Sequence, residues 1–217
     1  MNKIFYLPVF LFIFSCTGKH TSDAPKAIVN PVIENSEDVK ADTLRVNIQK
    51  SGIQWIATEM RGIRRRKGIL SFGNGFFLMR KNELVGGNFI VAMETMDVTD
   101  IPTNEKIARN NLLNHLKSVD FFNVVKYPQS LLELTNIQKV GIDSLRISGN
   151  LSIREVTKNI EFFAHQNDSI FRANFTFNRF DWNIAYKGNW ADKTLVDKDV
   201  ELKIEIITEP RVRKNRP

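Results

Sequence analysis

The sequence of 217 residues contains a single cysteine, Cys16, and only three histidines. One cysteine excludes an internal disulfide, so the folded part must be stabilised by its core alone. Zinc sites need three or four converging ligands. His20, His115 and His165 have no partners at such a spacing, so we expect neither a metal nor another cofactor.

Long apolar runs are also rare, and the longest lies at the start of the chain. It covers Ile4–Phe14, whereas a membrane-spanning helix needs about 20 residues. A lysine before the run and Ser15-Cys16 after it are typical of a secretory signal. Residues 13–16 (Ile-Phe-Ser-Cys) resemble the bacterial lipobox, although a thiol lost with a cleaved signal is the alternative. We therefore expect a lipoprotein signal peptide at 1–15 and lipidation at Cys16.

Such an anchor would hold the protein in the cell envelope, on the periplasmic side of a bacterial membrane. More than one acyl chain on Cys16 would make the attachment stable. Thr17 is not an acidic residue, which by analogy with lipoprotein sorting favours the outer membrane. Residues 16–43 are polar, contain two prolines and show no sustained period, so we expect a flexible tether.

Signatures of enzymes and nucleotide-binding folds are missing as well. The glycine-containing stretches SFGNG and LVGGN do not open a helix, which excludes a phosphate-binding loop. No strand–helix–strand rhythm, nucleophile motif or converging acid–base set occurs. The sequence therefore predicts a protein that is not an enzyme.

Acidic residues are outnumbered, and the formal net charge is +7. Much of the excess lies in two clusters, at residues 64–67 and in the basic C-terminal tail at 209–217. A basic chain can bind nucleic acid, but the export signal argues against such a partner. We expect solvated clusters that lie over anionic phospholipid headgroups.

Alternation of apolar and polar residues dominates the rest of the chain. In residues 171–178 one face carries Phe171, Phe175 and Phe177, and residues 200–206 alternate in the same way, which places Glu201 and Glu205 on a solvated face. Further strands are expected at 44–50, 54–59, 68–72, 75–80, 84–96, 129–138, 144–153, 160–165 and 181–186, with a turn at Gly73-Asn74-Gly75. This many strands predict an all-β barrel or sandwich.

One segment has a helical period instead. Asn104 can cap a helix whose first turn carries Glu105, and Ala108, Leu112 and Leu116 follow at helical spacing. We expect one short helix at about 104–118.

The segment that begins within this helix and continues beyond it resembles the hallmark of the YceI family, exported proteins described as polyisoprenoid-binding. It carries His115-Leu116, Asp120-Phe121-Phe122 and Tyr127-Pro128. ISGNLSIREVTKNIEF, FNRFDWNI and DKDVELKI resemble further family segments in the same order. A His-x-Gly of the family is replaced by Arg66-Lys67-Gly68. The resemblance implies an extended, antiparallel, lipocalin-like β-barrel, here over residues 44–208.

The resemblance also implies an internal apolar tube for an isoprenoid or fatty-acyl lipid. The side chains expected to contact such a ligand are His115, Asp120, Phe121, Phe122, Phe175, Phe177, Arg179 and Trp182. For His115 a hydrogen-bonded structural role is favoured over contact with a headgroup. For Arg179 an ion pair with Asp181 or Asp120 is favoured over binding a diphosphate.

Two functions follow from these expectations. The first is carriage of a long apolar lipid in the barrel lumen, driven by burial of the hydrocarbon chain. The alternative is a structural or partner-binding module whose barrel is solid. A continuous apolar tube of several hundred Å³ is required by the first function and absent from the second.

Overall fold

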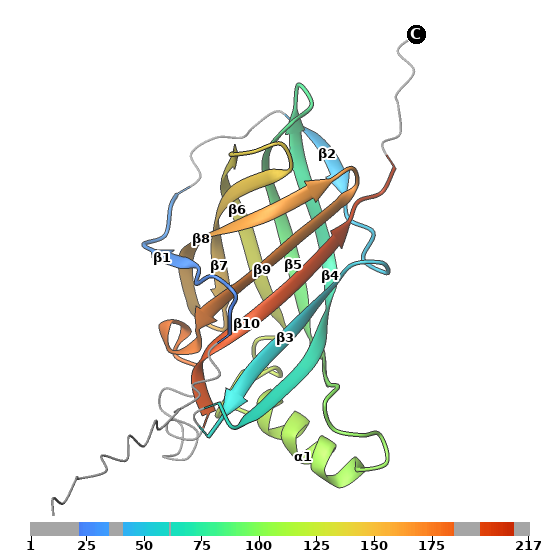
Figure 1. The fold of residues 1–217 in the computed structure, drawn as a ribbon, viewed down its shortest axis with the longest axis vertical. Coiled ribbons are helices and arrows are strands. Elements are labelled where there is room, and N and C mark those ends of the chain that lie inside the picture. The colour runs from blue at the N-terminus through green and yellow to red at the C-terminus, as the bar shows by residue number, and fades with distance from the viewer. Residues whose placement is uncertain (1–21, 35–40, 61, 185–195, 211–217) are drawn as a thin grey trace, which may run out of the picture.

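The computed structural model describes residues 22–34, 41–60, 62–184 and 196–210 (Figure 1). Eight antiparallel strands close into a barrel, and one α-helix lies at one end of it. The barrel strands are β3 (Gly52–Glu59), β4 (Arg64–Arg80), β5 (Glu83–Val98), β6 (Gln129–Lys139), β7 (Ser144–Ile153), β8 (Val156–Asn167), β9 (Ile170–Asn178) and β10 (Val196–Ile207). The predicted extended antiparallel barrel with one helix is confirmed.

The shorter elements lie at the ends and along the outside of the barrel. They are β1 (Ile28–Asn30), β2 (Asp42–Arg45), the helix α1 (Lys106–Lys117) and the 3₁₀-helix η1 (Arg179–Trp182). We call the end of the barrel that carries α1 the helix end, and the opposite end, where β2 pairs with β4, the far end (Figure 1). In the described residues no helix has the length and apolar character needed to cross a bilayer.

Alternation along the strands produces the barrel wall, because successive side chains point to opposite faces of a strand. Phe171, Phe175 and Phe177 on β9 are buried, as predicted. β10 pairs with β9 on one side and with β3 on the other, so its apolar face also points into the lumen.

Four predictions of local secondary structure were wrong. The strand expected at 44–50 ends at Arg45 as part of β2, and residues 48–50 form a turn. The turn at Gly73-Asn74-Gly75 does not form: β4 continues through it, and a shift in the pairing with β5 lies between Phe72 and Asn74, as in a β-bulge. Residues 181–184 form part of η1 and a turn rather than a strand, and residues 185–186 lie outside the described part. Helix α1 begins at Lys106 with Glu105 at the N-cap instead of Asn104.

The barrel wall is completed by residues 25–30, which we call the N-terminal strap. β8 and β9 pair directly only near the far end, from Ala164 to Asn167. Nearer the helix end the strap lies between them, with β1 paired to β8 and Lys26 bridged to Thr176 of β9. Part of the segment predicted to be a tether is therefore built into the wall, because the two strands leave backbone groups there that need partners.

Residues on either side of the strap cover the outer face of the barrel. The side-chain amide of Asn150 accepts a hydrogen bond from the Ile33 N–H at 3.2 Å and donates one to the Ile33 carbonyl at 2.7 Å. Ser22 donates to the carboxylate of Glu201 at 2.8 Å. Glu201, expected on a solvated face, is consequently buried and also pairs with Arg65.

Phenylalanine rings pack across the lumen in the far half, and a separate pocket at the far end is lined by Leu44, Met79 and Leu84 among others. Ring centroids lie 4.4 Å apart for Phe77 and Phe171, 4.6 Å for Phe162 and Phe175, and 5.0 Å for Phe77 and Phe89. We call this set of buried rings the phenylalanine layer; it comprises Phe72, Phe77, Phe89, Phe162, Phe171 and Phe175. The lumen is therefore solid at the phenylalanine layer.

Candidate ligand-binding cavity

The helix-end half of the barrel contains a cavity with an almost wholly apolar wall. The volume that the centre of a water molecule can occupy is about 140 Å³, and the total unoccupied space, including the part open to solvent, is about 1060 Å³. Its wall is formed by Ile53, Trp55, Ala57, Glu59, Arg66, Leu70, Val91, Met93, Met96, Leu112, His115, Leu116, Phe121, Phe122, Ser130, Leu151, Ile153, Phe177, Arg179, Val196, Val200 and Leu202. The lumen is therefore hollow on the helix side of the phenylalanine layer.

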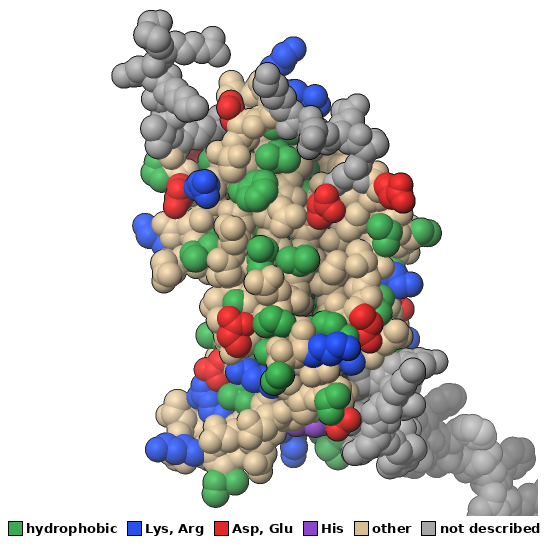
Figure 2. All heavy atoms as spheres, turned by 180° about the vertical axis from the view of Figure 1, so that it is seen from behind, with side chains coloured by type: hydrophobic (Ala, Val, Ile, Leu, Met, Phe, Trp, Pro, Cys, Tyr) green, Lys and Arg blue, Asp and Glu red, His purple; other side chains and the backbone are tan. Residues whose placement is uncertain are grey.

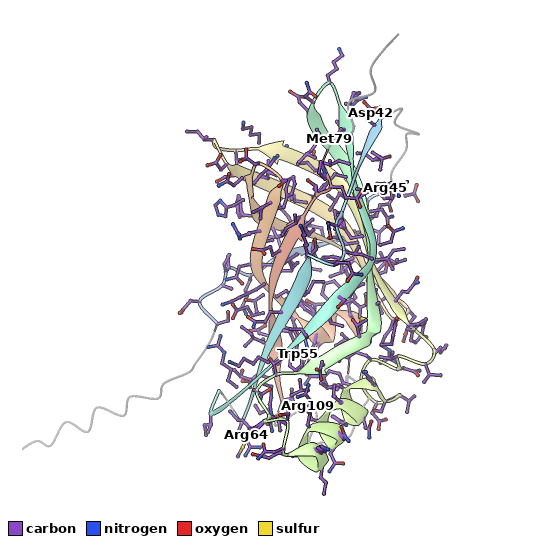
Figure 3. The ribbon with its side chains drawn as sticks, turned by 90° about the vertical axis from the view of Figure 1, so that its right-hand side faces the viewer. Asp42, Arg45, Trp55, Arg64, Met79 and Arg109 are labelled. Atoms are coloured by element: carbon purple, nitrogen blue, oxygen red, sulfur yellow. The ribbon has the colours of Figure 1, made fainter. Side chains whose placement is uncertain are left out.

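Strand β3 contributes one face of the cavity through alternate residues. Ile53, Trp55, Ala57 and Glu59 point inward, and Ala57 is the smallest side chain among them. Trp55 lies in the helix-side part of the barrel, above α1 (Figure 3). Its indole occupies the space where Gly68 has no side chain, since a Cβ there would lie 2.4 Å from the ring. Gly68 is therefore needed for the position of Trp55.

The hallmark segment closes the helix end of the cavity as a compact loop. After α1, backbone hydrogen bonds turn the chain back on the helix, from Phe122 to Leu116 at 3.1 Å and from Val124 to Lys117 at 3.1 Å. The guanidinium of Arg154 donates to the Phe121 carbonyl at 2.8 Å and fixes the loop to the β7–β8 turn. This geometry presents both Phe121 and Phe122 to the cavity, with ring centroids 5.1 Å apart.

Arg179 is the most deeply buried charged side chain at the cavity, with 1% of its surface exposed. It donates hydrogen bonds to the carbonyls of Asp197 at 3.1 Å, Ile184 at 2.9 Å and Val196 at 3.0 Å. Its guanidinium also lies 5.4 Å from the Phe121 ring centroid. The sequence favoured a carboxylate partner, whereas these hydrogen bonds go to main-chain carbonyls. Arg179 thus joins η1 to the start of β10.

The polar rim of the cavity carries an ion-paired arginine. Arg66 lies 3.3 Å from the Glu59 carboxylate and 3.1 Å from that of Asp100. Partial burial works to lower the pKa of Arg66, but the hydrogen bond to Asp100 and the negative charge of Glu59 outweigh it and raise the pKa. Arg64 and Arg65 continue the rim outward and remain more than half exposed. The rim is charged, while the wall below it is apolar.

Helix α1 is held across the cavity by an ion pair to β5. Arg109 donates to the carboxylate of Asp97, and this hydrogen bond lowers the pKa of Asp97 against the opposing effect of desolvation. Arg109 lies on α1 below Trp55 (Figure 3). Leu112 and Leu116 on the same helix face the lumen. The ion pair therefore fixes the helix so that its apolar side chains cover the cavity.

Five of the eight side chains predicted to contact a ligand line the cavity: His115, Phe121, Phe122, Phe177 and Arg179. The other three lie elsewhere. Asp120 is exposed on the loop, and Phe175 belongs to the phenylalanine layer. Trp182 is fully buried beside the cavity, where its indole N–H donates to the Leu151 carbonyl at 3.0 Å.

The sequence reading missed much of the wall, including Trp55, Ala57, Met93, Met96 and Leu112. The alternation of Ile53, Trp55 and Ala57 was a usable signal, since a small residue at an inward position leaves space opposite it. The methionines carried no such signal, because their inward positions depend on how β5 pairs with β4.

The polar groups on the wall are few, and several have structural partners. Glu59 pairs with Arg66, and the Ser130 hydroxyl lies 3.2 Å from the Met93 sulfur. Within the described ranges no group of three His, Cys, Asp or Glu side chains converges to hold a metal ion. The indole N–H of Trp55 is buried without a hydrogen-bond partner among these residues. Such a wall can bury apolar chains of a ligand.

The sequence profile of the YceI-like domain family matches residues 44–208. Among curated sequences, the protein YceI of Escherichia coli O17:K52:H18 is 41% identical over 64 residues, which are 30% of this chain and 31% of that protein. A UPF0312 protein of Azotobacter vinelandii is 46% identical over 44 residues, 20% of this chain and 23% of the relative. The chain thus matches less than a third of the length of these relatives.

Solved structures share the fold at low sequence identity. BcnA of Burkholderia cenocepacia superposes with a TM-score of 0.63 at 16% identity, over 76% of this chain and 99% of BcnA. A polyisoprenoid binding domain from Saccharophagus degradans, implicated in plant cell wall breakdown, gives 0.55 at 9% identity, over 79% of this chain and all of that domain (100%). Together with the match over residues 44–208, these similarities show that the chain belongs to the YceI-like domain family.

Proposed function

We propose that the protein binds the hydrocarbon chain of an isoprenoid or fatty-acyl lipid, without chemical conversion, in the cavity at the helix end of the barrel. The observation that carries this proposal is the apolar cavity in a closed barrel, enclosed by Trp55, Phe121, Phe122 and Phe177. The structural similarity to a polyisoprenoid binding domain supports the same ligand class.

The cavity also suggests how the lipid lies. The phenylalanine layer blocks the lumen toward the far end, so the end of the hydrocarbon tail stops against it. The charged rim lies at the other side of the cavity, where Arg66 is held by Glu59 and Asp100 and the more than half exposed Arg64 lies nearest to a polar or anionic headgroup. Tail-first entry from the helix end buries the apolar part and leaves the headgroup in solvent.

Burial of the tail supplies the affinity. Each methylene removed from water contributes about 0.8 kcal/mol, which is about fourfold in the dissociation constant. Because the layer ends the cavity, this gain should stop at the chain length that reaches it. The cavity is shorter than the barrel, so the protein should favour lipids with shorter tails than an open barrel of this length would accept.

Binding rather than catalysis is favoured by the wall chemistry. A general acid or base must reach a reacting group with a suitable pKa, yet Glu59 and Arg66 are engaged with each other and with Asp100. Arg179 is engaged with carbonyls. These groups stabilise the wall and rim.

The proposed location is the cell envelope, with lipidated Cys16 as the anchor on the periplasmic side of a bacterial membrane, the outer membrane being favoured. The support is the lipobox-like sequence at residues 13–16. Metabolic labelling with a radioactive fatty acid tests the anchor, because labelling should be lost in the Cys16→Ser variant.

Native mass spectrometry of protein purified from its own envelope tests ligand binding. We expect a population heavier than the protein by the mass of one lipid, released by organic extraction. The lipid-stripped protein should then bind alkyl chains of increasing length with about a fourfold gain per methylene up to a limit. Protein recovered lipid-free that also shows no dependence on chain length would overturn the proposal.

A further inference from the structure

The helix end of the barrel carries exposed hydrophobic side chains that the core does not use. In the described part of the chain, the most exposed large hydrophobic residues are Val125 at 97%, Ile142 at 88%, Ile63 and Ile107 at 81% and Val119 at 66%. All except Ile142 belong to the helix end. They come from the β3–β4 turn, the start of α1 and the loop after α1. Separate elements therefore present aliphatic side chains at the end where the cavity lies.

Basic side chains accompany these aliphatic residues. Lys106 and Lys126 are exposed on and beside α1, and no ion pair involves them in the part of the chain that the structure describes. The partly exposed Lys117 instead donates to the Glu94 carbonyl at 2.8 Å, and the ammonium of Lys126 lies 5.0 Å from the Tyr127 ring centroid. Figure 2 shows hydrophobic and basic side chains interspersed at the lower end, which is the helix end.

Several acidic groups at this end are already neutralised. Asp97 pairs with Arg109, and Glu59 and Asp100 pair with Arg66. The exposed lysines therefore remain available to an external anionic surface. Lysines near such a membrane surface each contribute about fivefold to binding, which corresponds to about 1 kcal/mol per residue. Aliphatic side chains between the lysines can enter the headgroup region at the same time.

The first described residues also lie at the helix end. Ser22 bonds to Glu201, and Lys26 pairs with Asp199 at 2.9 Å, both on the part of β10 nearest η1. Five residues separate Cys16 from Ser22, and an extended chain of that length reaches about 20 Å. An anchor at Cys16 would therefore hold the helix end close to the bilayer.

We propose that the helix end is a membrane-docking face that rests on an anionic phospholipid bilayer, with Ile63, Ile107, Val119 and Val125 in the headgroup region and lysines over the phosphates. We call it the docking face. This proposal is independent of lipid binding in the cavity, because it rests only on the exposed aliphatic side chains and the basic side chains at the helix end. Its position at the cavity would let a lipid pass between bilayer and lumen without crossing water.

An environment-sensitive fluorophore on one cysteine tests this face in the full chain. In a Cys16→Ser background, which removes the native thiol and any acylation, Val125→Cys carries the label on the docking face. Ile142→Cys carries it at the far end with similar exposure. Vesicles of phosphatidylcholine with phosphatidylglycerol are compared with vesicles of phosphatidylcholine alone.

We expect a blue shift at position 125 with anionic vesicles, quenched by nitroxide-labelled lipid, and no shift at position 142. Replacing Lys106 and Lys126 by Gln should weaken vesicle binding about 25-fold at low salt. Replacing Lys50 and Lys139, exposed toward the far end, removes the same charge and should leave binding unchanged. Equal responses at the two positions would assign attachment to the N-terminal segment and overturn the proposal, as would no response at position 125.

These outcomes are distinguishable from failure of the lipid-binding proposal. Val125 lies outside the cavity wall, so its response does not depend on an occupied lumen. If the protein docks on vesicles but binds no lipid, the docking-face proposal stands and the lipid-binding proposal fails. If it binds lipid but does not dock, the lipid-binding proposal stands and the docking-face proposal fails.

Discussion

Filling the cavity should stabilise the protein, whereas the same change in the solid half should destabilise it. Ala57 lies on the cavity wall, and Ala164 is buried among the core residues of the far half. We therefore compare Ala57→Leu with Ala164→Leu, which add the same three carbons at two inward positions.

The expected signs follow from the space at each site. At position 57 three added carbons remove apolar surface from water, worth about 2.4 kcal/mol at about 0.8 kcal/mol per methylene. Ordering the leucine side chain costs about 0.5–1 kcal/mol, so a net gain of about 1.5 kcal/mol remains. At position 164 the packed neighbours must move, which costs about 1–3 kcal/mol.

Urea unfolding of lipid-stripped protein measures both changes, as a shift of the midpoint at constant slope. Ala57→Leu should also weaken binding of an alkyl ligand by roughly 50-fold, because it occupies the volume of about three methylenes. If Ala57→Leu destabilises the protein as much as Ala164→Leu does, the helix-end half is filled and the reasoning about the cavity is refuted.

Three further predictions concern the residues that shape the cavity. Gly68→Ala should destabilise the protein by about 3 kcal/mol or more and change the Trp fluorescence spectrum, because the new Cβ would lie 1.9 Å from the Asp97 carbonyl and 2.4 Å from the Trp55 ring. Gly52→Ala is the control, since no atom lies within 4 Å of its added Cβ. This control should change the free energy of unfolding by less than about 0.5 kcal/mol. Arg179→Lys should lower the free energy of unfolding in urea by about 2–4 kcal/mol, since one ammonium cannot replace a guanidinium that reaches three carbonyls. A decrease of less than about 1 kcal/mol would contradict that role. The pKa of Asp97 is lowered in the folded protein, so its ion pair with Arg109 stabilises the protein at pH values above the ordinary pKa of 3.8, and this stabilisation is lost as the pH falls through the lower pKa of the folded state. The difference in the free energy of unfolding between the protein and Asp97→Asn should therefore shrink from about pH 5 to about pH 2. A difference independent of pH would speak against the ion pair.

Much of the architecture could be predicted from the sequence because strand alternation is a local pattern. The inward face of β9, with Phe171, Phe175 and Phe177, follows from period two alone. The helix also follows from local spacing, although its first turn differs by two residues. The continuity of β4 through Gly73 does not follow, because a bulge and a turn have the same residue signature.

The candidate site could be predicted only in part. The hallmark segment, which spans the end of α1 and the loop after it, identified His115, Phe121 and Phe122 as neighbours of the lumen. Sequence alone cannot say which inward rings pack against each other, so Phe175 was expected beside the ligand and lies in the solid half. The hydrogen bonds of Arg179 to three main-chain carbonyls could not be predicted, because carbonyls freed by irregular backbone cannot be seen in a sequence.

The N-terminal strap determines when the barrel wall can close during folding. Thr176 and the residues around Ile160 that pair with the strap lie more than a hundred positions later in the chain. The strap is synthesised early, yet it has no place to bind until β8 and β9 have formed. Contacts between such distant segments slow folding. We therefore expect the nascent barrel to pass through a state with an open seam, and a chaperone that holds the unsealed edge would act on this stage of maturation.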